Sequence, residues 1–202
     1  MTLHEMDKWI KHCDFYFKQS DSLVLHPTIE MPIHTDILLY APTEELPFWK
    51  LVTMGASDYK MPVKKAQLGD RNEYVVFVDP KEDLKDQALC QRYAAYLWEI
   101  ALYPVQTKTY ITYGHSVEWK PEAGERIVGA SLEFPQIIPD TGVLRCKLGF
   151  MKTVILLQAY LLNREENERL LEIGPQQFSQ YIYPDGDGDG HFLNRLSLNT
   201  GE

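Results

Sequence analysis

The sequence predicts a single α+β domain built on a mixed, mostly antiparallel sheet with flanking helices. Segments typical of helices and strands follow one another in the order helix, strands, helix, strands, helix. One segment, Tyr74–Val78, is apolar on both faces, as expected of a central strand that is covered on each side. The 202 residues allow one sizeable core, and no linker divides the middle of the chain. We therefore expect one domain over residues 1–183 and a flexible acidic tail over residues 184–202.

The first half of the chain begins with a predicted helix over residues 2–19. Thr2 and Glu5 have the spacing of a capping box, and apolar residues recur at helical spacing behind them. Two prolines predict a loop or irregular structure over residues 20–34. Apolar segments rich in β-branched and aromatic residues then predict three strands, at residues 36–41, 48–54 and 74–78.

The second half begins with a predicted helix over residues 84–103. Leu89, Tyr93 and Leu97 lie along one stripe of this helix, and Pro104 is expected to end it. Four further strands are expected, at residues 107–113, 128–134, 143–150 and 153–162.

Two helices are predicted to close the domain, at residues 164–173 and 175–182. Asn163 can cap the first of them, with Glu166 reaching back to it, and the sequence Gly-Pro at residues 174–175 ends it.

The composition is that of an ordinary globular protein, with 45% hydrophobic and 24% charged residues. The formal net charge is −9, from 29 acidic and 20 basic residues. A negative surface repels phosphate backbones and anionic lipids, so neither nucleic acid nor a membrane surface is an expected partner. A protein with a basic surface fits this charge better.

The three cysteines, Cys13, Cys90 and Cys146, lie far apart and form no CxxC pair. This pattern argues against a disulfide framework and against a thiolate metal cluster. The N-terminal residues lack the basic region and apolar run of a signal peptide, so a cytoplasmic location is expected.

A serine after Gly-x, at Ser57, resembles a nucleophile elbow. The hydrolase pattern is G-x-S-x-G, but Tyr59 stands in place of the second glycine. A serine hydrolase using Ser57 with His115 as base is therefore the alternative function. The simpler interpretation is a turn, in which Gly55 adopts a positive φ and Ser57 or Asp58 acts as a cap.

The sequence predicts no cofactor and no metal site. The six histidines form no HExxH pattern, and neither a P-loop nor GxGxxG is present. The tail sequence DGDGDG at residues 185–190 resembles the start of a calcium loop. However, Leu196 stands where that loop needs a bidentate acid, so we expect a flexible acidic turn that binds calcium weakly at most.

Two segments, FWKLVTMGASD at residues 48–58 and YGHSVEW at residues 113–119, together carry a family resemblance. With DILLYAPTEELPF before them and TVILLQAYLLNREENERL after them, they resemble the suppressor of fused family over roughly residues 35–180. The resemblance implies an α+β domain that binds proteins and has no known catalytic activity.

Animal members of this family are larger, two-domain proteins that grip a short extended peptide of a Gli transcription factor. The chain has length for the first of those domains and is similar to bacterial stand-alone members, for which a role as immunity proteins against polymorphic toxins is implied. We expect a protein partner, a toxin with a basic surface in this interpretation, to bind near the two motif turns. The expected partner-binding residues are Asp58, Tyr59, His115 and Trp119.

Overall fold

The computed structural model describes residues 1–63, 69–121, 124–184 and 191–196, and these form a single α+β domain, as predicted. The helices are α1 (Leu3–Phe17), α2 (Gln87–Thr107), α3 (Arg164–Ile173) and α4 (Pro175–Ile182), with short 3-10 helices η1 (Ala56–Asp58) and η3 (Thr141–Leu144). The strands are β1 (Leu23–Leu25), β2 (Asp36–Tyr40), β3 (Trp49–Met54), β4 (Asn72–Val78), β5 (Ser116–Glu118), β6 (Ile127–Glu133), β7 (Arg145–Lys147) and β8 (Thr153–Asn163).

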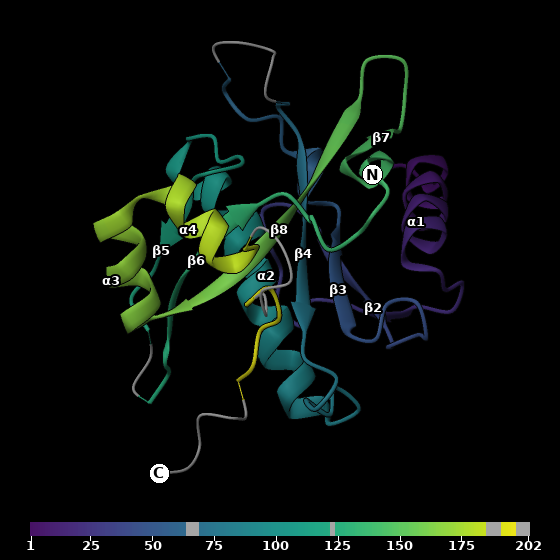
Figure 1. Cartoon of the computed structure of the whole chain (residues 1–202). Helices are drawn as coiled ribbons and strands as arrows, with labels where there is room; N and C mark the ends of the chain where they lie inside the picture. Colours follow the sequence, from purple (N-terminus) through teal and green to yellow (C-terminus); the bar gives the residue numbers. More distant parts are fainter. Residues whose placement is uncertain (64–68, 122–123, 185–190, 197–202) are drawn as a thin grey trace.

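The strands form one mixed sheet in the order β1-β2-β3-β4-β8-β6-β5, and β7 also pairs with β8. The pair β4 and β8 is parallel, and the other described pairs are antiparallel. All seven residues of β4 are buried, as expected of a central strand covered on both faces. Figure 1 shows α1 on the side of β2 and β3, and α3 on the side of β5 and β6.

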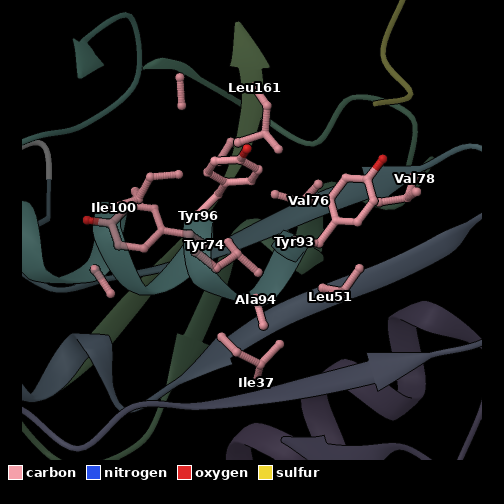
Figure 2. Packing of buried hydrophobic residues seen from close by; sticks show 14 of the residues in the cluster. Ile37, Leu51, Tyr74, Val76, Val78, Tyr93, Ala94, Tyr96, Ile100 and Leu161 are labelled. Carbon is pink, nitrogen blue, oxygen red and sulfur yellow. The ribbon is translucent and has the colours of Figure 1, made fainter. Parts of the chain in front are cut away.

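The helix α2 covers one face of the sheet. Its residues Tyr93 and Ile100 lie in one buried cluster with Leu51 of β3, Val76 of β4 and Leu161 of β8 (Figure 2). The strand residues of this cluster alternate along the chain, because successive side chains of a strand point to opposite faces.

The helix α1 covers the opposite face. Its residues Trp9 and Phe17 are fully buried in a second cluster with Val75 and Phe77 of β4. The indole N–H of Trp9 donates a hydrogen bond to the carbonyl oxygen of Thr53 at 2.9 Å, which fixes α1 against β3. Both predicted capping boxes are present, at the start of α1 and at the start of α3.

Three element predictions were wrong. The helix α2 runs through Pro104 to Thr107, because Pro104 is buried in the packed face of the helix and only one turn follows it. Residues 107–113 are not a strand: Thr107 ends α2, and the carbonyl oxygen of Ile111 accepts a hydrogen bond from the side chain of Asn72. The segment 143–150 contains the end of η3 and only a three-residue strand, β7.

The segment 20–34, expected to be irregular, contains the edge strand β1. The three residues of β1 are all apolar, so the sequence shows no alternation there that would predict a half-buried strand. Leu23 and Val24 are exposed, and pairing with β2 forms the strand.

Residues 191–196 of the expected loose tail lie against the sheet. Asn194 pairs with Val78, the last residue of β4, Leu196 is buried in the cluster under α2, and Arg195 forms an ion pair with Asp79 at 2.5 Å. The candidate calcium segment, residues 185–190, lies outside the described residues. None of the described helices has the length and apolarity needed to cross a membrane.

Candidate functional site

The turn after β3 is the structure that the first sequence motif specifies. Gly55 has φ = 127°, a conformation that side chains rarely adopt, and η1 follows it directly. A Cβ atom at Gly55 would collide with the carbonyl oxygen of His34. Glycine therefore serves two purposes here: it permits the turn, and it lets the chain before β2 approach the turn closely.

A buried carboxylate, that of Glu73 on β4, binds this turn. It accepts hydrogen bonds from the backbone N–H groups of Gly55 at 2.9 Å, Ala56 at 3.2 Å and Ser57 at 3.0 Å, and from the hydroxyl of Thr53. Burial raises the pKa of the Glu73 carboxyl, and the hydrogen bonds from Thr53 and the turn lower it in part. The motif is thus a structural turn around a buried carboxyl group, with the positive φ at Gly55 that its simpler interpretation predicted. The predicted side-chain cap from Ser57 or Asp58 is not formed at η1, and the Glu73 carboxyl binds the N–H groups of the turn instead.

Ser57 is not placed as a nucleophile. Its side chain is fully buried, its N–H is bonded to Glu73, and its carbonyl oxygen accepts from Arg71 at 2.7 Å. Among the hydrogen bonds of the described residues, none joins Ser57 to a histidine. The geometry therefore lacks the serine–histidine contact that a triad requires.

Asp58 carries the exposed charge of the turn. Its carboxylate forms an ion pair with Lys152 at 2.7 Å and another with the amino group of Met1, and Lys152 also contacts Glu5 at 3.2 Å. Tyr59 is half-buried and packs against the cluster under α2, so part of its side chain contributes to the core.

The tip of the β7–β8 connection lies beside Asp58. Phe150 and Met151 are 94% and 90% exposed, and they directly precede Lys152, which binds Asp58. The ammonium group of Lys8 on α1 donates to the carbonyl oxygen of Leu148 at 3.0 Å and so ties this tip to α1. We call Asp58, Phe150, Met151 and Lys152 the tip surface.

The second motif lies at the other end of the sheet. The ring of His115 contacts that of Tyr110 at 5.2 Å between centroids, and both backbone groups of His115 are hydrogen-bonded. Trp119 is half-buried, stacks on Tyr96 at 5.9 Å, and lines a groove of about 580 Å³ between the end of β5 and α3. Leu171 of α3, which is 69% exposed, forms part of the same groove.

The structure does not bring the two motifs together into one surface. Asp58 and Tyr59 follow β3, whereas His115 and Trp119 flank β5, which lies four positions further along the sheet. At about 4.8 Å per strand, this separation is roughly 19 Å across the sheet. Asp58 forms an ion pair with Lys152, the residue before β8. The backbone N–H of Trp119 instead donates to the carbonyl oxygen of Val128 in β6, which lies beside the other end of β8. These are two separate candidate surfaces.

A third cluster, not predicted from the sequence, consists of His26, His34 and Asp36. Nδ1 of His26 lies 2.8 Å and Nε2 of His34 lies 3.0 Å from the same carboxylate oxygen of Asp36. The spacing His-x-Asp at residues 34–36 was a usable signal, because residues i and i+2 of a strand share a face. The contribution of His26 depends on the pairing of β1 with β2, which the sequence did not reveal.

Comparisons with known proteins agree on one family. A family model described as Suppressor of fused protein (SUFU) matches residues 31–195. The fold matches a crystal structure described as a SUFU (suppressor of fused protein) homolog from Neisseria gonorrhoeae FA 1090, with 14% identity, 96% of each chain covered and a TM-score of 0.64. No curated protein matches the sequence.

Two further structures share the fold. One is the Sufu–Fu complex, with 14% identity, a TM-score of 0.63, and 94% of this chain and 88% of that chain covered. The other is Drosophila Suppressor of Fused, with 14% identity, a TM-score of 0.64, and 92% of this chain but only 48% of that chain covered. At this level of identity the likeness shows the fold alone.

Proposed function

The chain belongs to the suppressor of fused family, and on that basis we propose that it is a non-enzymatic module that binds another protein. One structure of the same fold is the Sufu–Fu complex, which supports binding as the activity. The observation that carries the proposal is the tip surface. Two adjacent large apolar side chains there are at least 90% exposed, beside the Asp58–Lys152 ion pair.

The tip surface has the composition of a binding site. An apolar centre of Phe150 and Met151 would be buried in a complex, and the charges of Asp58 and Lys152 form a polar rim around it. The position is also held firmly, because Lys152 contacts both Glu5 of α1 and Asp58 of the turn. A pre-ordered surface loses less conformational entropy when a partner binds.

The partner that we propose has a basic surface. The net charge of −9 would attract such a protein over a distance and would make the association rate fall as salt is added. Within this proposal, the specific role is that of a cytoplasmic immunity protein that neutralises a toxin of the polymorphic class. The acidic charge supports that role.

The serine hydrolase alternative has no geometric support in the described residues. Its nucleophile would be Ser57, whose side chain is fully buried beneath the turn that Glu73 organises. A substrate carbonyl could not reach this hydroxyl without opening the turn.

The test begins with cross-linking and capture of the partner from the cells of origin, followed by binding measurements on purified proteins. Phe150→Ser combined with Met151→Ser should weaken binding at least about tenfold, because central apolar contacts dominate interface energies. Leu171→Ser is the matched control, since it removes an exposed apolar side chain from the other candidate surface. If the partner is a toxin, co-expression of the wild-type chain should restore growth, and the double variant should not.

Melting temperatures separate a binding defect from a folding defect. Phe150 and Met151 are so exposed that the double variant should melt like the wild type. If the double variant binds normally and Leu171→Ser does not, the tip surface is the wrong site and the groove beside Trp119 is the binding surface. If no protein binds specifically, the proposed function is wrong.

A further inference from the structure

The cluster of His26, His34 and Asp36 has the chemistry of a metal site. Two ring nitrogens converge on one carboxylate oxygen, at 2.8 Å and 3.0 Å, and the three ligand atoms all lie within 4.8 Å of one another. The two histidine side chains are about 70% exposed, whereas Asp36 is 4% exposed. A buried carboxylate is thus covered by two imidazoles whose outer sides face solvent.

The fold supplies this cluster through strand register. The pairing of Leu23 with Leu39 and of Leu25 with Ile37 places His26, by continuation, directly opposite Asp36. His34 lies two residues before Asp36, which puts both side chains on the same face of an extended chain. The three ligands therefore come from the two sides of the β1–β2 connection.

The backbone beneath the cluster is held by contacts from other elements. The indole N–H of Trp98 on α2 donates to the carbonyl oxygen of Thr35 at 2.8 Å. The carbonyl group of His34 lies against Gly55, and Asp36 pairs with Met54 at the end of β3. The ligands thus lie on an ordered backbone, which reduces the entropy lost on binding an ion.

The present distances are those of hydrogen bonds, and a metal ion fits with a small adjustment. Zn²⁺ bonds to imidazole nitrogen at about 2.0–2.1 Å and to carboxylate oxygen at about 2.0–2.2 Å, so tetrahedral ligands lie roughly 3.3 Å apart. The two nitrogen–oxygen distances would have to open by roughly 0.3–0.5 Å, and the two ring nitrogens, which lie within 4.8 Å of each other, would also have to be roughly 3.3 Å apart. The exposed imidazoles can make this movement by small rotations, with Asp36 remaining in place.

We propose that His26, His34 and Asp36 bind a divalent transition-metal ion, in the first instance Zn²⁺, with a fourth coordination position open to solvent. Two imidazoles and one carboxylate suit zinc and its neighbours, whereas calcium and magnesium prefer an all-oxygen shell. The metal binds the lone pair of a neutral imidazole, so Nδ1 of His26 and Nε2 of His34 must give up the protons that they hold toward Asp36. Each proton moves to the other nitrogen of the same ring or, from an imidazolium, to solvent. The proposal is independent of the tip surface and of the proposed function.

Titration calorimetry of the tag-free chain with ZnCl₂ tests this site. We expect one equivalent to bind, and His26→Ala and His34→Ala each to weaken binding about tenfold or more. His4→Ala is the matched control, because it removes an exposed histidine from α1 and should leave binding unchanged. Co²⁺ should bind in place of zinc and give visible absorption bands that both histidine variants lose.

A second readout is thermal. Zinc that binds the folded state should raise the melting temperature of the wild type and of His4→Ala, but not of the double variant His26→Ala, His34→Ala. The exposed histidines can be removed without disturbing the core, so the double variant should fold. If the wild type takes up no zinc, or if the double variant binds as tightly as the wild type, the proposed site is wrong.

Discussion

At the scale of single residues, the carboxylate of Glu73 decides the shape of the turn after β3. Its two oxygens accept from three backbone N–H groups and one hydroxyl, so no proton is needed on them. A neutral carboxylic acid would lose one acceptor position, and among these partners the hydroxyl of Thr53 alone could turn to accept its proton. The three backbone N–H donors thus favour an ionised carboxylate, whereas burial opposes the charge and raises the pKa of Glu73.

Glu73→Gln should therefore destabilise the protein by about 2 kcal/mol, because hydrogen bonds to a charged group are worth roughly 1.5–3 kcal/mol each and the amide NH₂ faces the donors of the turn. Urea unfolding followed by circular dichroism measures the change in free energy. Glu44→Gln, at an exposed position, is the control and should unfold like the wild type. A variant Glu73→Gln of unchanged stability would show that the carboxyl is neutral in the folded protein.

At the scale of elements, local capping signals set the start of α3, whereas tertiary packing sets where α2 ends. α3 follows its local signals: the Asn163 side chain accepts from the N–H of Glu166 at 2.9 Å, and Glu166 accepts from the N–H of Asn163 at 2.9 Å. α2 overrides its local signal at Pro104: the residues before it pack on the sheet, Pro104 itself is buried, and the helix continues to Thr107. Packing dominates where a helix covers the core.

Asn163→Ala should cost about 1 kcal/mol of stability, the usual value of a lost N-cap. Denaturant midpoints measure it. Asn163→Asp retains the capping oxygen and adds a charge that favours the helix N-terminus, so it should be close to the wild type. Equal losses in the two variants would mean that Asn163 acts through its packing rather than as a cap.

At the scale of the whole molecule, buried tyrosines govern the response to high pH. Burial raises the pKa of Tyr96 to about 12 and raises the pKa of Tyr40, Tyr74 and Tyr160 further. In the unfolded chain these phenols lose their protons near pH 10. The folded state then binds more protons than the unfolded state, so stability falls as pH rises above about 10.

Lysine and cysteine side chains also modify this profile. Burial lowers the pKa of Lys50 to about 8; its unfolded value is higher, so this group adds stability as pH rises from about 8 to 10.5. Burial raises the pKa of Cys146 to about 11, which acts in the same direction as the tyrosines and starts near pH 9. Because the tyrosines outnumber the lysine, the loss above pH 10 dominates.

We expect the rise in tyrosinate absorbance to accompany the loss of circular dichroism above pH 10, in a single cooperative step. Free N-acetyltyrosine amide, titrated in parallel, should ionise near its ordinary pKa of about 10. Tyrosinate absorbance that rises fully at pH 10 while the circular dichroism persists would contradict this prediction.

Local sequence signals were sufficient to locate several of the helices and strands. Capping boxes and helical spacing located α1 and α3, and the apolar runs located β2, β3, β4, β6 and β8. Gly55 marked the turn, because a positive φ is a local demand on one residue. The family resemblance then indicated a binding domain, which the family match supports.

The fold determines which segments meet, because contacts between distant residues depend on register and packing rather than on local propensity. It paired β4 with β8 in parallel, extended α2 through Pro104, and bound residues 191–196 to the sheet. It separated Asp58 from Trp119, both of which had been predicted to bind the partner. It also joined His26 to His34 and Asp36, since the register of an exposed edge strand leaves little trace in the sequence.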